Sequence, residues 1–264
     1  MTSPAWRHRN QVIQNQAAVA AKVALERKDE KTIQTLTSDK ARFELLLTAL
    51  ENDCNRISAL PKGGARTELK RELLKTWLPV INAYLAGDQV YQNIALTQVL
   101  VWCFDIGDIN EALRLADAAI EQQQPMPERY KRNVKTYVAD AILDWCRDQQ
   151  ARTTGGDIPG NARPGSAGNK TADATPGAIE PYFSRMYEQA MSWPIHDDIK
   201  LKYVRLAALQ AKSAGDLEKS LELCEQAEKI DSRKAQVKTL KTELNKAIAA
   251  QQESARHKAA KAGK

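Results

Sequence analysis

The sequence predicts an all-α protein with long N-terminal helical arms and a helical bundle, and three observations lead to this class. Apolar residues recur at spacings of three, four and seven along most of the 264 residues, which is the periodicity of amphipathic helices. Between Val90 and Ile106, 12 of 17 residues are apolar, a density typical of a helix buried on all sides. Glycine and proline are concentrated in one tract, residues 153–177, and helix breakers are sparse elsewhere.

The densest apolar stretch predicts a helical hairpin at the centre of the fold. Gly107 and Asp108 interrupt the run that ends at Ile106, and a second apolar stripe follows from Ile109 to Ile120. This stripe ends before the Pro125-Met126-Pro127 segment. The interval between the two stripes is so short that the helices should be antiparallel neighbours.

Three helices are expected before this hairpin. The first, residues 4–31, has a thin alanine-rich stripe that needs a partner, and the third begins near Ala65 and should kink or restart at Pro79. The second, residues 35–60, has apolar spacings that suit a coiled-coil-like seam. The seam consists of Leu36, Phe43, Leu46, Leu47, Leu50, Cys54 and Ile57.

The chain after the hairpin predicts one more helix, a linker and four C-terminal helices. Residues 127–152 have a helical pattern, and the Gly- and Pro-rich tract after them is too polar to offset its ordering entropy. The expected C-terminal helices cover residues 179–193, 197–214, 217–230 and 234–250. The predicted divisions are therefore basic arms (1–76), a helical core (77–152), a linker (153–178), a C-terminal unit (179–250) and a basic tail (251–264).

A sequence pattern in the core recurs in the C-terminal unit. Gly215-Asp216 and the residues to Leu223 echo Gly107-Asp108 and the residues to Leu115, and Ala227 matches Ala119. A helix, a Gly-Asp turn and a returning Leu-x-Leu-x-x-x-Ala helix resemble a tetratricopeptide unit, although the copies are 108 residues apart instead of in close tandem. The second hairpin is a candidate for docking a partner, and an explanation from packing alone stays open.

Charge placement points to a polyanionic partner. The net charge is +6, and residues 1–75 hold 14 Lys and Arg against 9 Asp and Glu, whereas residues 76–250 are nearly balanced. Basic extremities on a neutral body are expected of a protein that contacts a polyanion such as double-stranded DNA, whereas the +6 total alone would favour a role in solubility. The predicted DNA-binding residues are Arg7, Arg9, Lys62, Arg66, Lys70, Arg71 and Lys75. Solvated helix ends and surface salt bridges are the alternatives.

No catalytic or metal-binding pattern is found, so we predict no catalytic residues, metal or cofactor. The three histidines are far apart, and the P-loop and serine-nucleophile motifs are absent. The acidic pair Asp197-Asp198 beside His196 is interpreted as the start of a helix, where its charge complements the dipole. The four isolated cysteines are interpreted as buried thiols. The sequence has no long apolar run and no signal pattern, which favours a cytoplasmic protein.

Several of these residues together resemble a known family. They are Thr2-Ser3-Pro4-Ala5, Arg7-His8, Arg71-Glu72-Leu73-Leu74, Trp77-Leu78-Pro79, Leu96, Val99, Leu100, Trp102, Asp105, Gly107-Asp108-Ile109, Ala112-Leu113, Pro125-Met126-Pro127, Gly215-Asp216 and the basic tail. The combination resembles the small terminase subunit of tailed phages, in the branch of temperate, contractile-tailed phages with cohesive ends. Members of this branch are often labelled the terminase endonuclease subunit. Residues 153–177 depart from the family as an insertion-like linker.

The resemblance implies a packaging subunit without ATPase activity. Such a subunit recognises cohesive-end DNA, assembles as a homo-oligomer and delivers the DNA to the large terminase (ATPase) subunit in the host cytoplasm. From the residues themselves, we predict that the basic ends bind DNA, that the seam at residues 36–57 mediates self-association, and that the C-terminal unit binds the large subunit. A tetratricopeptide-like scaffold that binds only protein, and an endonuclease acting on DNA by itself, are the alternatives.

Overall fold

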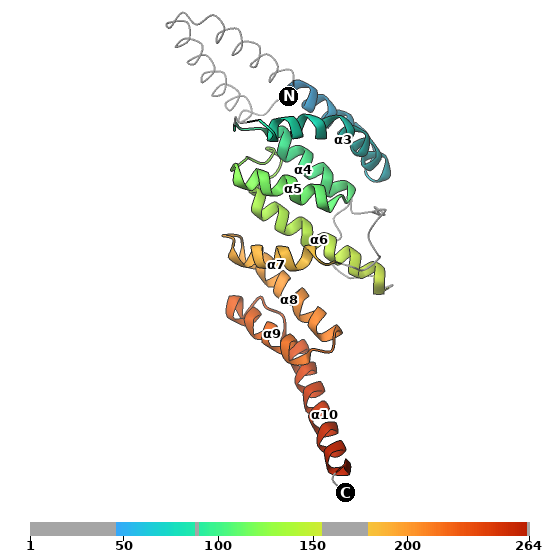
Figure 1. Cartoon of the computed structure of the whole chain (residues 1–264), viewed down its shortest axis with the longest axis vertical. Coiled ribbons are helices and arrows are strands. Elements are labelled where there is room, and N and C mark those ends of the chain that lie inside the picture. Colours follow the sequence, from blue (N-terminus) through green and yellow to red (C-terminus); the bar gives the residue numbers. More distant parts are fainter. Residues whose placement is uncertain (1–45, 88–89, 155–178, 263–264) are drawn as a thin grey trace, which may run out of the picture. The chain divides into compact units, whose positions relative to one another are not determined.

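The computed structural model describes residues 46–87, 90–154 and 179–262, and every regular element in these ranges is an α-helix. The predicted all-α class is confirmed, and Figure 1 gives the order of the helices. The described residues form two compact units, the first up to Val134 and the second from Lys135 onward. The predicted first arm, residues 4–31, lies outside the described residues.

The first unit begins with two helices joined by a glycine turn. Residues 46–59 are helical, and α3 (Gly64–Leu85) follows after Gly63, whose φ of 112° lies in the region that favours glycine. Trp77 of α3 donates from Nε1 to Asp53 Oδ2 of the preceding helix at 2.9 Å. Helix α3 does not restart at Pro79, which is exposed, so water can hydrogen-bond the carbonyl left without an amide partner.

The predicted central hairpin is formed by α4 (Ile94–Ile106) and α5 (Ile109–Glu121). Residues 95–103 of α4 are all buried, as the continuous apolar run indicated. Asn93 caps α4 by accepting a hydrogen bond from the Ala95 amide at 3.1 Å. The segment after α5 is held to α4, because Thr97 Oγ1 donates to the carbonyl of Pro125 at 2.7 Å.

The second unit consists of α6 (Val134–Thr154) from Lys135 onward, α7 (Tyr182–Ser192), α8 (Asp197–Ser213), α9 (Leu217–Asp231) and α10 (Lys238–Ala262). Helix α6 belongs here because the Tyr203 hydroxyl of α8 donates to the Ala139 carbonyl at 2.7 Å. The rings of Trp145 and Tyr182 also meet edge to face at 5.4 Å. The domain boundary that the sequence predicts at residue 153 was drawn from composition and stays a prediction. The compact unit described here begins at Lys135.

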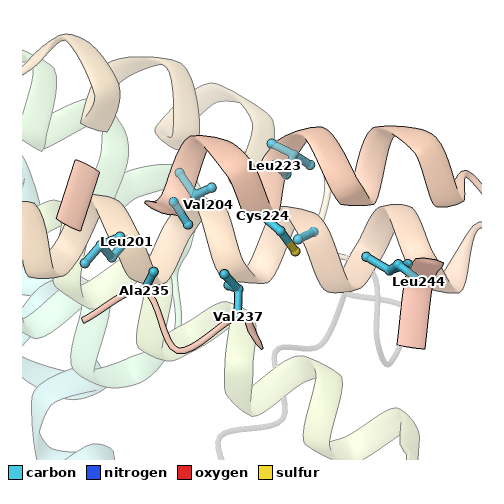
Figure 2. Packing of buried hydrophobic residues seen from close by; sticks show 9 residues of the cluster. Leu201, Val204, Leu223, Cys224, Ala235, Val237 and Leu244 are labelled. Atoms are coloured by element: carbon cyan, nitrogen blue, oxygen red, sulfur yellow. The ribbon is translucent and has the colours of Figure 1, made fainter. Parts of the chain in front are cut away.

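An apolar cluster holds α8, α9 and the start of α10 together. Figure 2 shows Leu201 of α8 beside Ala235, and Val204 of α8 and Val237 near Cys224 of α9. Leu244 of α10 is fully buried in the same cluster. None of the described helices combines the length and the apolar character that crossing a bilayer requires.

The Gly-Asp echo corresponds to two turns of the same geometry. The glycines Gly107 and Gly215 have φ values of 82° and 84°, and the amide of the next aspartate closes the turn on a carbonyl five residues earlier. Asp108 and Asp216 then accept a hydrogen bond from the amide three residues on, at 3.1 and 3.0 Å. The matching buried pairs are Ala112 and Ser220, Leu115 and Leu223, Ala116 and Cys224, and Ala119 and Ala227.

These turns account for the recurring pattern as a shared helical hairpin. The helices before and after each turn pack on one another through residues at the same register. The further likeness to tetratricopeptide units stays a prediction.

Candidate nucleic-acid interface

Arg66, the first predicted DNA contact in α3, satisfies the end of the preceding helix. Its Nε donates to the Leu60 carbonyl at 2.8 Å, and a terminal guanidinium nitrogen donates to the Ser58 carbonyl at 3.0 Å. The last carbonyls of a helix lack amide partners within the helix. The Gly63 turn reverses the chain, so a side chain in the first turn of α3 can reach back to them. Arg66 therefore stabilises the two-helix arm.

Lys70 joins α3 to α4. Its Nζ lies 2.6 Å from Asp105 Oδ2, and only 15% of the lysine side chain is exposed. The position is on the buried side of α3, one turn before Leu74 and two turns before Trp77. A phosphate would have to displace Asp105 before it could contact this ammonium group.

The remaining α3 cations lie on the other side of the helix. Arg71 is 3.0 Å from Glu68, and Lys75, one turn further, is exposed and has no ion-pair partner among the described residues. Lys62, in the turn before α3, is likewise exposed and unpaired within the described ranges. The predicted basic residues of α3 are thus divided between two faces of the helix. Spacing of four residues shows which side chains are neighbours, but it does not show which face of the helix is buried. Arg7 and Arg9 lie outside the described residues.

A second group of cations precedes α6, in a segment that the sequence assigned to a helix. Arg129, Lys131 and Arg132 are all exposed, and the Arg129 guanidinium lies 4.9 Å from the ring centre of Tyr130. The Tyr130 amide donates to the Pro127 carbonyl at 2.8 Å, which makes a turn instead of a first helical turn. The sequence feature that could have indicated this group is the cation-rich run at residues 128–135. It was missed because charges were summed over residues 76–250, where positive and negative residues nearly balance.

The acidic pair of the C-terminal unit lies at a helix start, as interpreted from the sequence. Asp197 and Asp198 occupy the first turn of α8, after His196 at the N-cap position. Asp198 is 3.0 Å from Lys234, and this ammonium group lowers the pKa of the Asp198 carboxyl below its usual value. The pair therefore interacts with the helix dipole and a lysine, although neither aspartate is the N-cap residue.

The cysteines are apolar packing groups. Cys103, Cys146 and Cys224 are buried, and burial raises the pKa of the Cys146 thiol to about 12. Cys54 is half-buried; burial raises the pKa of its thiol, while the Arg129 guanidinium acts in the opposite direction. Within the ranges that the structure describes, no three His, Cys, Asp or Glu side chains gather closely enough to hold a metal ion.

The geometry defines an all-helical protein built around two matching hairpins, with exposed cations that have no acidic partner in the described part of the chain. Residues 47–159 match the family model described as phage small terminase subunit. The chain is 31% identical over 226 residues to the "Probable terminase, endonuclease subunit" of Haemophilus phage HP1, which covers 80% of this chain and 71% of that protein. The chain belongs to the phage small terminase subunit family.

A second relative has a similar name. The chain is 32% identical over 132 residues to the "Terminase, endonuclease subunit" of Escherichia phage P2, which covers 50% of this chain and 49% of that protein. No solved structure matches the chain. Membership of the family is therefore established by sequence similarity. The positions of surfaces that could bind DNA or protein are inferred from the helices and contacts described above.

Proposed function

We propose that this chain binds double-stranded DNA at the cohesive-end site and delivers it to the large ATPase subunit of the terminase. The large subunit then cleaves the DNA and packages it into the procapsid in the host cytoplasm. The observation that carries the proposal is membership of the small terminase subunit family, with a relative aligned over 80% of the chain. Polyanion binding by such a protein requires cations that are exposed and not already paired.

Of the DNA contacts predicted in the described ranges, Lys62 and Lys75 best meet this requirement, because both are exposed and unpaired there. Arg66 and Lys70 already bind carbonyl and carboxylate groups of the chain itself. We assign to Arg66 and Lys70 the role of holding the two-helix arm in shape, and to Lys62 and Lys75 the contact with phosphate.

Self-association and docking to the large subunit remain part of the proposal. Leu47, Leu50 and Ile57 of the predicted seam are buried within the chain itself. Leu36 and Phe43 lie outside the described residues, and self-association through the seam stays a prediction. The exposed surface of the α8–α9 hairpin is the proposed docking face for the large subunit. Its Leu209 side chain is 49% exposed, a large apolar group that a protein partner would cover.

The delivery role can be tested by reconstituting cleavage. Purified large subunit with ATP and cohesive-end DNA should give specific cleavage only when this chain is added, because recognition is assigned here. Cleavage of random duplex should not increase to the same extent. Equal cleavage of cohesive-end DNA with and without this chain would contradict the proposed role.

A second candidate function is favoured by the names of both relatives, which call them endonuclease subunits. Under this reading the chain itself would cut DNA. The purified chain with magnesium and no large subunit would then nick cohesive-end DNA, and Asp197→Ala or Asp198→Ala would abolish the cut. We place cleavage in the large subunit, so we expect intact DNA in that experiment.

A further inference from the structure

The segment between α5 and α6 has more unpaired positive charge than α3. Arg129 and Lys131 are exposed and make no ion pair with any described residue, and Arg132 beside them is also exposed. In α3, by contrast, Lys70 and Arg71 have carboxylates within 3.0 Å. We refer to residues 129–132 as the basic loop.

The basic loop is held in a defined shape. The segment before it is anchored, since Met126 and Pro127 are buried and the Pro125 carbonyl accepts from Thr97. The turn hydrogen bond from the Tyr130 amide to Pro127 and the stacking of Arg129 on the Tyr130 ring fix the loop itself. A cation held in place by such contacts loses less side-chain entropy on binding than a free one.

The loop also runs directly into the start of a long helix. Helix α6 begins at Val134 and continues for 21 residues, and the amides of a first turn carry a partial positive charge. The loop cations are therefore followed in the sequence by a helix start whose amides have the same sign of charge. The ligand chemistry that matches exposed, fixed cations is the phosphate backbone of a duplex, which is recognised by its charge and not by its bases.

We propose that the basic loop Arg129-Tyr130-Lys131-Arg132 is a phosphate-contact surface for double-stranded DNA, additional to the predicted contacts at Lys62 and Lys75. The inference rests on the proposed function, because it assumes that the chain binds DNA. It assigns a nucleic-acid role to residues in the nearly neutral middle of the sequence. Arg129 and Lys131 provide the direct contacts, and Tyr130 positions Arg129.

The test compares two double variants of the full chain. Arg129→Ala/Lys131→Ala should reduce the slope of log affinity against log salt by about 1.8, since each lost phosphate contact removes about 0.9. Lys229→Ala/Lys238→Ala is the matched control, because both lysines are exposed and unpaired within the described ranges and the net charge changes equally. This control should retain the wild-type slope. Arg129→Lys, which keeps the charge, should also retain it.

A footprint on the wild-type chain gives an independent measurement. Duplex DNA should protect Lys131 from acetylation severalfold, while Lys229 on α9 should react at the same rate with and without DNA. An unchanged slope in the loop variant, an equal loss in the control variant, or unprotected Lys131 would overturn the inference while the proposed function stands. If the wild-type chain does not bind duplex at all, both proposals fail.

Discussion

The face on which a basic residue lies decides what it does in this protein. Arg66 and Lys70 are four residues apart on α3, and both are on the side that packs against the rest of the first unit. Their charges satisfy a helix end and the Asp105 carboxylate. Lys75 has the same chemistry as Lys70 but is exposed. Charge alone therefore does not identify a DNA contact here.

The structural role of Arg66 predicts a loss of stability. Arg66→Ala should lower the free energy of unfolding by about 1 to 2 kcal/mol, because two carbonyls lose a charged donor. Lys75→Ala is the matched control and should change it by less than about 0.5 kcal/mol. Urea denaturation of both variants measures this difference. If the two variants were equally stable, the capping role of Arg66 would be wrong.

The buried thiols predict an order of chemical reactivity. Only a thiolate reacts rapidly with a disulfide reagent, and a pKa of about 12 keeps Cys146 protonated at pH 8. Half-buried Cys54 should therefore be labelled first in the native protein, while Cys103 and Cys146 should react only after unfolding in urea. Mass spectrometry of the labelled peptides gives the order. Labelling of Cys146 in native protein as fast as in urea would contradict this placement.

Among the helices, the two Gly-Asp turns are the clearest link between sequence and structure. Gly107 and Gly215 supply the left-handed residue that ends one helix, and the next aspartate caps the helix that follows. The same pattern of buried positions then follows on α5 and α9. A two-residue turn made of a left-handed glycine and a capping aspartate is so short that the two helices it joins must be close and antiparallel.

Each part of this turn should have a measurable effect on stability. Gly215→Ala should lower the free energy of unfolding by about 1 kcal/mol from backbone strain alone, since nothing lies within 4 Å of an added Cβ. Asp216→Ala should cost about 1 kcal/mol through loss of the cap. Gly64→Ala, in equally open space without a positive φ, is the control and should cost nothing. Thermal unfolding of the three variants provides the measurement, and a neutral Gly215→Ala would refute the strain argument.

The sequence predicts the helices well wherever the apolar period and breakers agree, as in α4 and α5. It fails at residues 127–133, where cations and Tyr130 fit a helical period but the Pro127 carbonyl accepts a turn hydrogen bond. The candidate site is less predictable than the fold. Spacing puts Arg66 beside Lys70, but which side of α3 is buried depends on contacts such as that of Trp77 with Asp53, which are distant in sequence. The pairing of Lys70 with Asp105 is equally nonlocal.

At the scale of the whole molecule, we propose that DNA binding depends on cations that are exposed and unpaired within the described ranges. The net charge of +6 is modest, so overall charge would give weak attraction to DNA. Local groups such as the basic loop, held in fixed positions, can give a stronger and more salt-dependent contact than the total indicates. The two units provide the framework in which these groups are presented.

The measurement that tests this account most directly is the affinity of the purified full chain for cohesive-end and random duplexes between about 50 and 200 mM salt. We predict that log affinity falls linearly with log salt for both duplexes and that the cohesive-end duplex binds more tightly throughout. Failure to bind either duplex at the lowest salt concentration would contradict the account.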